Sequence, residues 1–393
     1  MNLIELGTIL NFTKGKKPKV QSSEKKEGFL PYLDIKAFET GKITSYTDGE
    51  KCTPCEEGDI LIVCDGSRSG LVGIATKGYV GSTLAIVSAD GIDNRYLFRY
   101  LQGKYTLLNT NKKGTGTPHL KVDLLKNQKI LIGSFDEQKQ IVENVETMLS
   151  KLDESVETLQ KTKQQLSVYR QAVLKIAFEG QYSNAKPDKY DRLGNYIEKP
   201  KYGTSKKCSY LKENNSVPVF RIPNINYNSN SISHIDIKYA SFSEEELSPI
   251  RLNKNDILLI RSNGSVSIVG RSAIVKDIDI GATFAGYLMR LRVKDNAMIY
   301  PKFVLWFLQS YDARVYIETV AKSTSGVNNI NSGEVADLMI PIFTYDKQKD
   351  IVNAIESRLS VCDSIEKTVN SALQEAESLR QSILKQAFEG EQS

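Results

Sequence analysis

The sequence predicts an α+β fold in which two similar globular units of mixed α and β structure are each followed by a long helix. Segment 136–180 returns at 346–390 without a gap, and 19 of its 45 positions are identical. Each copy lacks Gly and Pro before its closing glycine, as a continuous helix requires. The remaining segments, 1–134 and 181–344, contain matching strand-like runs. We therefore expect an internal pseudo-two-fold repeat.

The composition excludes several classes of protein. The 393 residues carry 52 basic and 47 acidic side chains and are 40% apolar, which is typical of two or three soluble domains. Neither a run of 18 apolar residues nor a secretory leader is recognised, so we expect a cytoplasmic protein. Five scattered cysteines fit a reducing compartment, and two histidines leave little room for a histidine-rich metal site.

The first globular unit is expected over 1–134. A buried strand over 59–63 follows Gly58 and ends in a Gly/Ser turn. A short helix over 96–102, a polar loop over 112–119 and a strand over 129–132 follow.

The first long helix is expected over 135–180. Ser134 and Glu137 have the spacing of a capping box, and Gly180 can adopt the left-handed conformation that ends a helix. Forty-four residues make a rod of about 66 Å, which needs a partner. The residues expected to face this partner form a seam along the helix, at alternating steps of four and three residues. They are Ile141, Val145, Met148, Leu152, Ser155, Leu159, Thr162, Leu166, Tyr169, Val173 and Ile176.

The second half repeats this order, with a globular unit over 181–344 and a helix over 345–393. It has a strand over 256–260, a short helix over 303–309, a polar loop over 322–329 and a strand over 338–342. Its seam is expected at Ile351, Ile355, Arg358, Cys362, Ile365, Val369, Ala372, Ala376, Leu379, Ile383 and Gln386. Because the two helices share length and register, we expect them to pack on each other, although two unrelated surface helices are the alternative.

Positive charge is concentrated in the globular units. Each has a net charge of +5, whereas segments 135–180 and 346–390 are each −2. An excess of this size fits a polyanion partner, and an ordinary solvated surface explains it about as well. Its combination with the paired polar loops favours nucleic acid.

Those loops carry side chains suited to DNA. Arginine matches guanine, asparagine matches adenine, and lysine suits phosphate. The candidate DNA-binding residues are Ser67, Arg68, Lys112, Lys113, Thr115 and His119 in the first unit and Arg261, Asn263, Ser265, Lys322, Asn328 and Asn329 in the second. The alternative is that arginine and asparagine in turns only cap backbone groups.

Catalytic motifs are weak, so we expect a protein that is not an enzyme and holds no cofactor or metal of its own. No phosphate-binding loop, His-Glu-x-x-His run or Asn/Asp-Pro-Pro-Tyr/Phe run occurs. Cys52 and Cys55 lack the second pair that zinc needs, and free cysteines are the expected state. Asp188 with the run 236–238 resembles a nuclease site only vaguely.

The chain resembles the specificity (S) subunits of type I restriction-modification systems over nearly its whole length. The endings at 170–180 and 380–390 look like the ends of that family's helical regions. Segments 202–205, 218–225 and 255–264 look like its target recognition domains. In the first domain Leu6, Gly7 and 58–63 fit, but Cys64-Asp-Gly-Ser67 replaces the Arg-x-Asn-Gly found at 261–264.

The resemblance implies a non-catalytic subunit that recognises a bipartite DNA target. Each recognition domain would read one half, and an antiparallel helix pair would set the spacing. Two methyltransferase subunits and the ATP-dependent restriction subunits would bind it, and S-adenosylmethionine, ATP and magnesium would belong to these partners. The resemblance adds these candidate DNA contacts: Tyr202, Thr204, Ser205 and Arg221.

The repeated helix ends are the candidate partner-binding residues: Arg170, Lys175, Phe178, Arg380, Lys385 and Phe388. Their repetition is equally expected if they contact the recognition domains. Two other classes stay open for the whole chain. One is a sequence-specific nuclease or methyltransferase with its own active site, and the other is a coiled-coil scaffold without DNA binding.

Overall fold

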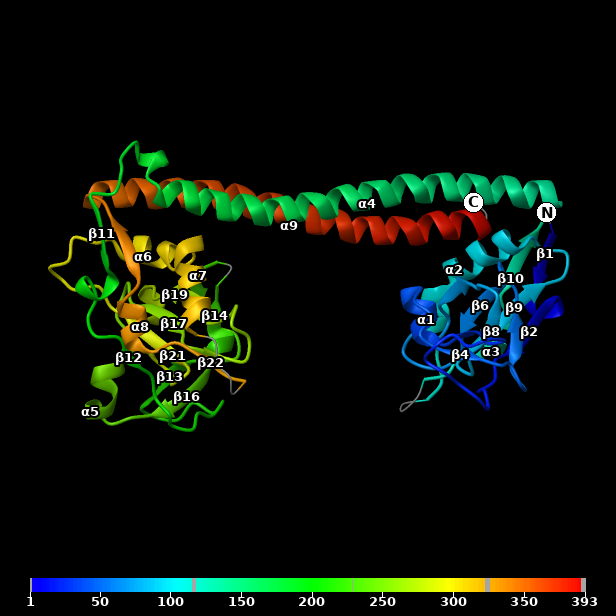
Figure 1. The fold of residues 1–393 in the computed structure, drawn as a ribbon, viewed down its shortest axis with the longest axis horizontal. Helices are drawn as coiled ribbons and strands as arrows, with labels where there is room; N and C mark the ends of the chain where they lie inside the picture. Colours follow the sequence, from blue (N-terminus) through cyan, green and yellow to red (C-terminus); the bar gives the residue numbers. More distant parts are fainter. Residues whose placement is uncertain (1, 115–117, 228, 322–325, 390–393) are drawn as a thin grey trace. The chain divides into compact units, whose positions relative to one another are not determined.

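The structure is a computed structural model that describes residues 2–114, 118–227, 229–321 and 326–389. It divides into two compact units, the first made of Met1–Gln160 with Asn370–Ser393 and the second of Lys161–Val369. Each unit therefore combines one globular domain with parts of both long helices (Figure 1).

The first domain is built around a four-stranded antiparallel sheet in the order β2-β9-β6-β7. A second sheet has the order β4-β3-β8-β5, and β1 pairs with β10. Its elements are β1 (Asn2–Glu5), β2 (Leu10–Lys14), β3 (Leu30–Leu33), α1 (Ile35–Thr40), β4 (Tyr46–Thr47), β5 (Thr53–Cys55), β6 (Ile60–Val63), β7 (Val72–Ile74), β8 (Gly78–Val80), β9 (Leu84–Ala89), α2 (Asn94–Thr110), α3 (Val122–Lys126) and β10 (Lys129–Ile132).

The second domain repeats this plan with a larger sheet in the order β12-β21-β17-β19-β15-β14. A three-stranded sheet, β16-β13-β20, and the pairs β11-β23 and β18-β22 complete it. Its elements are β11 (Lys189–Arg192), β12 (Lys201–Tyr202), β13 (Ser216–Phe220), β14 (Ile225–Asn226), β15 (Ser231–Ile232), β16 (Lys238–Ser241), α5 (Glu244–Leu247), β17 (Ile257–Ile260), β18 (Ser262–Asn263), β19 (Ser272–Ile274), β20 (Thr283–Phe284), β21 (Leu288–Leu291), α6 (Pro301–Phe307), α7 (Tyr311–Val320), β22 (Asn328–Asn329), α8 (Ser332–Ala336) and β23 (Met339–Ile342).

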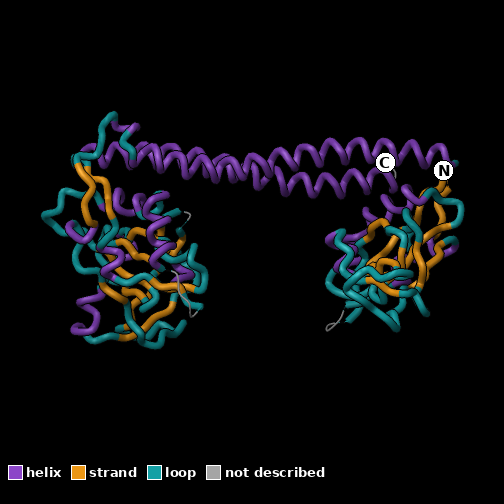
Figure 2. Tube along the Cα trace, viewed as in Figure 1, coloured by secondary structure: helices purple, strands orange, loops and turns teal. Residues whose placement is uncertain are grey.

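The two domains share one topology. In each, a fully buried strand, β6 or β17, lies between two antiparallel neighbours. Each also has an equivalent parallel pair, β3 with β8 and β13 with β20, and the second domain has a further parallel pair, β15 with β19. Helix α2 is much longer than the short helix expected from the sequence, whereas the second domain uses two helices, α6 and α7, in this region. Strands, helices and loops alternate throughout both domains (Figure 2).

The long helices are α4 (Phe135–Phe178) and α9 (Tyr345–Glu389). The capping box is present, because Ser134 N–H donates to Glu137 Oε2 at 2.8 Å and Glu137 N–H donates to Ser134 Oγ at 3.3 Å. Gly180 has a φ of 82° in the turn that follows α4. The helices run side by side and antiparallel in each unit (Figure 1). The predicted α+β class with a paired antiparallel coiled coil is therefore confirmed.

Half of the expected seam is wrong by one residue. Val145, Leu152, Leu166 and Val173 are buried as expected. The intervening position lies one residue later, since Met148 is 54% exposed and Leu149 only 4%. The second helix shows the same shift. Leu359, the residue after the expected seam position Arg358, is buried, whereas the expected seam residues Ile365 and Leu379 are 40% and 51% exposed.

The shift has two physical reasons. Leu149 and Leu359 are selected because they pack into the core of a globular domain. Arg170 and Arg380 lie at the seam because they bind acidic residues of the partner helix. Leu149 packs into the core of the first domain together with Val142 and Val145. A seam predicted from the heptad pattern considers contacts with the partner helix alone. These residues of α4 also pack against a globular domain, which the pattern does not reveal.

A buried glutamine fastens the start of each long helix to the domain before it. Gln138 Oε1 accepts from Asp93 N–H at 2.8 Å, and its Nε2 donates to Gly91 and Gly133 carbonyls. Gln348 repeats the arrangement with Tyr300 N–H at 2.7 Å and the carbonyls of Met298 and Phe343. Both side chains are essentially inaccessible, so three backbone groups depend on each amide.

About two turns further along, a repeated glutamate binds α2 in the first domain and α6 in the second. Glu146 accepts from Arg95 and Arg99 of α2, and Glu356 accepts from Lys302 of α6 at 3.0 Å. The end of the other long helix completes each core. Phe388 of α9 packs edge-on against Tyr96 and Tyr100 in the first unit.

Phe178 of α4 takes the corresponding place in the second unit, against Phe303 and Phe307. Each domain is thus held by the start of one long helix and the end of the other. Within the described ranges, no helix is both long and apolar enough to span a membrane.

Candidate nucleic-acid interface

The polar hairpin of the second domain grows from its most buried strand. β17 contributes four fully buried residues, and the chain then leaves the core at Arg261. β18 pairs with β22, so Ser262 lies opposite Asn329 and Asn263 opposite Asn328. Asn328 Nδ2 donates to Gly264 O at 2.9 Å, and Asn263 Oδ1 accepts from Ser265 N–H at 2.9 Å. Asn329 and Ser265 remain exposed.

Arg261 is held in place at the base of this hairpin. Its guanidinium lies 4.4 Å from the centre of the Tyr202 ring, and Nη1 donates to Gly286 O at 3.1 Å. Tyr202 is in turn positioned by Ser332, whose N–H donates to the phenol oxygen at 3.0 Å. Thr204 joins the same region because its carbonyl accepts from Gly286 N–H, and Ser205 is exposed beside it. The predicted residues Tyr202, Thr204, Ser205, Arg261, Asn263, Ser265, Asn328 and Asn329 therefore come together.

Arg221 lies in a separate cluster. It donates to the side chain of Asp236 at 2.8 Å and to its carbonyl at 2.6 Å. Hydrogen bonds from Tyr210 and then Arg221 lower the pKa of Asp236. This bonding ties Arg221 to β16 and its preceding turn rather than to the hairpin.

The first domain builds a related hairpin from different residues. Lys113 and His119 exchange two backbone hydrogen bonds of 2.8 and 2.7 Å, and Gly66 N–H donates to Pro118 O at 2.8 Å. His119 Nδ1 lies 2.7 Å from Asp65 Oδ1, and Lys14 Nζ lies 3.1 Å from Asp65 Oδ2. Burial tends to raise the pKa of Asp65, but hydrogen bonds from His119 and Lys14 outweigh it and lower the pKa overall.

The loop after β6 is tied down by its neighbours. Lys112 Nζ donates to Ser67 O at 2.8 Å, and Asn109 Nδ2 donates to the carbonyls of Ser67 and Ser69. Arg68 pairs with Glu39 of α1 at 3.0 Å but remains about half exposed. Ser67, Arg68, Lys112, Lys113 and His119 thus lie around one loop and one hairpin, while the predicted residues Thr115 and Lys322 fall outside the described residues.

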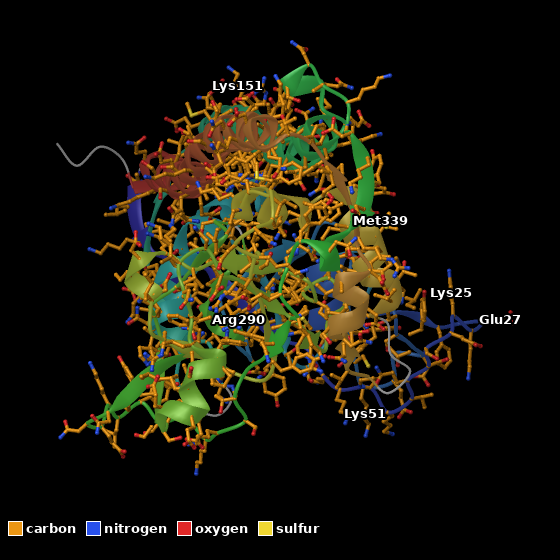
Figure 3. All side chains as sticks on the ribbon, turned by 90° about the vertical axis from the view of Figure 1, so that its left-hand side faces the viewer. Lys25, Glu27, Lys51, Lys151, Arg290 and Met339 are labelled. Carbon is orange, nitrogen blue, oxygen red and sulfur yellow. The ribbon has the colours of Figure 1, made fainter. Side chains whose placement is uncertain are left out.

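The structure adds residues that the sequence analysis did not single out. Asp65 and Lys14 join the first hairpin, and Asn109 fixes its loop. Lysine runs visible in the sequence also follow β2 and β12, and these lysines are exposed: Lys16, Lys17, Lys19, Lys25 and Lys26 in the first domain, and Lys206, Lys207 and Lys212 in the second. Lys25 lies toward the outer end of its loop in Figure 3.

Not all positive charge is available at the surface. Arg290 is 4% exposed and donates to Arg251 O at 3.0 Å, and it lies among the side chains of its domain in Figure 3. Burial, together with Arg292, lowers the pKa of Arg290. It therefore supports the fold and is not positioned to contact a polyanion.

The candidate partner-binding residues at the helix ends are mostly engaged. Phe178 and Phe388 are buried against the domains, 8% and 3% exposed. Arg170 binds Asp363 and Glu366 of α9, and Arg380 binds Asp153 of α4. Lys175 is exposed, and Lys385 has an interaction of its own. The contacts with the domains, which were the alternative, are present for Phe178 and Phe388, whereas Arg170 and Arg380 contact the other long helix. Partner binding stays a prediction.

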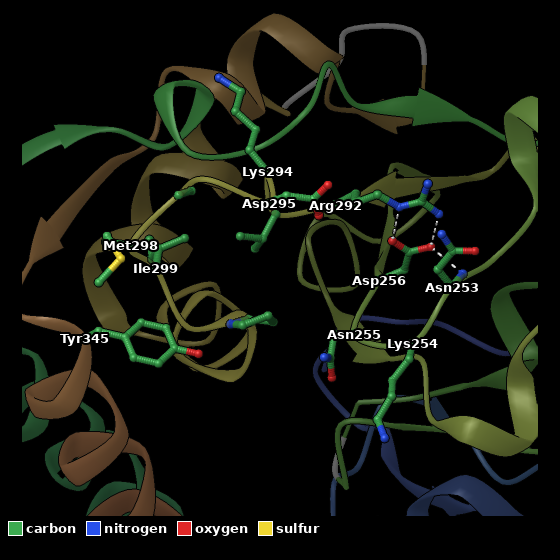
Figure 4. Close-up of a pocket in the computed structure, with 13 residues that line it drawn as sticks. Asn253, Lys254, Asn255, Asp256, Arg292, Lys294, Asp295, Met298, Ile299 and Tyr345 are labelled. Carbon is green, nitrogen blue, oxygen red and sulfur yellow. Dashed lines mark hydrogen bonds and ion pairs between the residues drawn. The ribbon is translucent and has the colours of Figure 1, made fainter.

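A pocket of about 460 Å³ lies in the second unit between the turn before β17, the loop after β21 and the start of α9 (Figure 4). The Asp256 carboxylate in this pocket is already bound by neighbouring residues. Arg292 donates to both of its oxygens at 2.7 and 2.6 Å, and Asn253 N–H donates to the same carboxylate. Asp256 accordingly shapes the turn. Asp59 does the same before β6 by accepting from Glu56 N–H.

The described residues hold no cluster of three or more His, Cys, Asp or Glu side chains able to bind a metal ion. The five cysteines are free, and those at positions 55, 64 and 362 are buried. Cys52 and Cys55, the spaced pair noted in the sequence, lie in or beside β5.

Comparisons with known proteins are consistent with this architecture. A family model described as the type I restriction modification DNA specificity domain matches residues 1–168 and 189–375. The chain is 24% identical over 418 residues to the specificity subunit of the type I restriction enzyme EcoBI of Escherichia coli, which covers 99% of this chain and 85% of the relative. It is 30% identical over 268 residues to the StySPI specificity subunit of Salmonella potsdam, covering 67% and 57% respectively.

A solved structure is similar over 98% of this chain and 97% of its own, with a TM-score of 0.77 and 17% sequence identity. It comes from a study of complex assembly and conformational transition of the type I R-M system.

Proposed function

The chain belongs to the family of the type I restriction modification DNA specificity domain, and from this premise we propose that it recognises a bipartite DNA sequence without catalysing a reaction itself. In this proposal each domain reads one half of the target. The chain then directs methyltransferase and restriction subunits to that site. Action on DNA also makes the cytoplasm the expected compartment.

The observation that carries the proposal is the repeated hairpin. In both domains the most buried strand leads directly into a short polar hairpin, at Arg261 in the second domain and Cys64 in the first. A two-stranded ribbon of this kind fits the major groove, where base edges present a unique pattern of donors and acceptors. Two such hairpins in one chain match a target with two halves.

The surrounding lysines supply a different part of the binding energy. Lys16, Lys25 and Lys206 represent the exposed lysines that follow β2 and β12. Contacts from such side chains to phosphate position a protein on the duplex and release counterions, but carry no sequence information. Each good bidentate base contact would then add roughly 1–3 kcal/mol of discrimination.

The expected partners are two methyltransferase subunits and the restriction subunits. S-adenosylmethionine, ATP and magnesium would be held by these partners, since methyl transfer and ATP-driven cleavage belong to them in this proposal. Extrusion of the target adenine from the stack would likewise be the work of the methyltransferase.

In each unit, one edge of the helix pair is a docking surface that we propose for a methyltransferase subunit, with Met148 and Leu379 in the first unit and Tyr169 and Ile365 in the second. Met148, Tyr169, Ile365 and Leu379 are each 40–54% exposed. Met148 immediately precedes the buried Leu149, and the other three immediately precede partly buried charged residues at the seam: Arg170, Glu366 and Arg380. In an antiparallel pair, positions related in this way on the two helices border the seam on the same side. Apolar side chains along such an edge are suited to a protein partner. Tyr169→Glu with Leu379→Glu should abolish co-purification of the methyltransferase while leaving the chain folded.

A genome-wide map of methylated bases tests the proposed function. The map is compared between the source strain and a strain in which this gene is deleted. Loss of one bipartite adenine-methylated motif is the expected result and would give both half-sites and their spacing. An unchanged map in a strain that expresses active partner subunits would contradict the proposal.

Binding by the purified chain separates the alternatives. DNA affinity should fall steeply as salt concentration rises, because phosphate contacts release counterions. Affinity that is absent at low salt would favour a scaffold without DNA binding. Cleavage or methylation by the chain alone, with metal or S-adenosylmethionine added, would favour an enzyme.

A further inference from the structure

Backbone pairing aligns the two hairpins residue by residue. Leu120 N–H donates to Cys64 O at 2.7 Å, and Ile330 N–H donates to Arg261 O at 2.9 Å, so Cys64 occupies the place of Arg261. Asp65 pairs with His119 as Ser262 pairs with Asn329. His119 is therefore the counterpart of Asn329.

The neighbouring strand gives a third equivalence. Lys14 of β2 lies opposite Ala85 of β9, and Tyr202 of β12 lies opposite Met289 of β21. Because Ala85 and Met289 occupy matching positions against β6 and β17, Lys14 stands where Tyr202 stands.

The two domains thus fill the same three places with different chemistry. The second domain has a guanidinium stacked on a phenol ring, Arg261 on Tyr202. In the first domain the place of Arg261 is taken by a buried thiol, Cys64, and the charged side chain belongs to the next residue, the carboxylate of Asp65. That carboxylate is largely covered, with 17% of its side chain exposed, whereas the side chain of His119 is 56% exposed.

We infer that His119 is the base-reading residue of the first domain and that Asp65 positions it. An ionised carboxylate can only accept hydrogen bonds, so Asp65 holds the proton on Nδ1 of the ring. When the ring carries only this proton, Nε2 is a hydrogen-bond acceptor, and 56% of the His119 side chain is exposed. In the major groove an acceptor matches the exocyclic amino group of adenine or cytosine.

Lys14 and Arg68 have supporting roles in this arrangement. Lys14 neutralises the second oxygen of Asp65 at 3.1 Å, which keeps the carboxylate from repelling DNA. Arg68 is paired with Glu39 and stands outside the three aligned places. The first domain therefore reads its half-site with an imidazole acceptor where the second uses the Arg261 and Asn329 side chains.

This inference rests on the proposed function, and a selection experiment tests both separately. The full-length chain is incubated with a randomised duplex library at several salt concentrations, and bound DNA is sequenced. Wild type should enrich a bipartite motif. His119→Ala should lower the preference for adenine or cytosine at one position of one half-site by about tenfold, and leave the other half-site unchanged.

The matched control is Asn329→Ala, which should alter only the other half-site. Asp65→Asn provides the sharper readout, because an amide can donate to Nδ1 and so move the ring proton to Nε2. That variant should extend the preference at the same position to guanine or thymine, whose major-groove edges offer acceptors. A merely structural role of Asp65 would weaken binding without changing which base is preferred.

Thermal unfolding of each variant checks that the fold is kept, and His119→Phe, which keeps a ring but has no acceptor, replaces His119→Ala if the latter unfolds. An unchanged motif for the folded histidine variant, with Asn329→Ala effective, would overturn the inference and leave the proposed function intact. If wild type enriches no motif at any salt concentration, the proposed function itself fails and the inference with it.

Discussion

Arg170 of α4 donates to Asp363 of α9 at 2.6 Å, and the pseudo-two-fold repeat forms the same bond a second time between Arg380 and Asp153. All four residues are identical between the repeated segments. Arg170 also binds Glu366 at 3.0 Å. The arginines stand at seam positions that the sequence assigned to the preceding apolar residues, Tyr169 and Leu379. The pair of bonds fixes the antiparallel register at two places along the helices.

Breaking these bonds should lower the free energy of unfolding only slightly, and the effects of the two ion pairs should add. Asp363 is 63% exposed, and ion pairs of such exposure contribute about 0.2–1 kcal/mol. A double-mutant cycle with Arg170→Ala and Asp363→Ala in urea unfolding should give a coupling energy in that range. The cycle for Arg380 and Asp153 serves as the internal comparison. Coupling above about 2 kcal/mol at either pair would contradict this account.

Removing either buried glutamine should cost far more. Gln138→Leu leaves one backbone N–H and two carbonyls without their partner, and an unsatisfied buried group costs about 1–3 kcal/mol. We expect a loss of at least 3 kcal/mol in the unfolding free energy, and the same for Gln348→Leu. Gln165→Leu, at an exposed position of α4, is the control and should change it by less than about 0.5 kcal/mol. Similar values for buried and exposed sites would refute the fastening role.

Truncating the terminal rings should loosen one unit at a time. Phe388→Ala removes a buried ring that contacts Tyr96 and Tyr100, with an expected loss of about 3–5 kcal/mol. Hydrogen exchange should quicken in α2 and β10 of the first unit, while α6 and β17 of the second stay protected. Phe178→Ala should give the opposite pattern. Uniform loss of protection in both units would show that the rings do not act locally.

Alkaline pH should weaken the first domain through Cys64. Burial raises the pKa of this thiol to about 12 from an ordinary value of 9.0. Below pH 9 the thiol is neutral in the folded and unfolded states, so its contribution is constant. As the pH rises from 9 toward 12 only the unfolded thiol ionises, and stability falls by about 1.4 kcal/mol per pH unit. Urea unfolding of Cys64→Ala between pH 8 and 10.5 should show a shallower decline than wild type, and equal slopes would disprove the effect.

Shortening both helices should move the two half-sites closer. Deleting 157–163 and the equivalent 367–373 removes one heptad from each helix and keeps the Arg170 and Arg380 bonds. Seven residues correspond to about 10.5 Å of helix, or about 3 base pairs. The methylated motif of this variant should keep both half-site sequences with a shorter spacer. A heptad deleted from α4 alone is the control and should abolish methylation. An unchanged spacer in the double deletion would exclude the helices as a ruler.

Much of the fold could be predicted because the repeat is visible in the sequence. The gapless copies locate both helices, and the buried runs at 59–63 and 256–260 locate the central strands. The seam was only half right, because Met148 and Leu149 are both apolar and only the packed domain selects between them. Gln138 and Gln348 are visibly repeated, but their role depends on backbone groups of a loop that folds beside them.

The candidate interface was predicted less completely. Arg261, Asn263 and Asn328 sit beside recognisable turns, and the structure brings them together. Lys14 and Tyr202 could not be matched in sequence, because loops of different length separate each from its hairpin. Arg221 looked equivalent in type to Arg261, but Asp236 binds it elsewhere in the domain.

Each domain packs against the start of one long helix and the end of the other, and this arrangement has a consequence for biosynthesis. Leu384 and Phe388 belong to the core of the first domain, yet more than 200 residues separate them from the rest of that core. A ribosome releases the first domain early, but the ring that closes it is translated after the whole of the second domain. The second domain, by contrast, receives Phe178 before its own strands are made. The domain that is synthesised first is therefore the last to complete its core, and its exposed apolar surface must be tolerated or shielded until translation reaches α9.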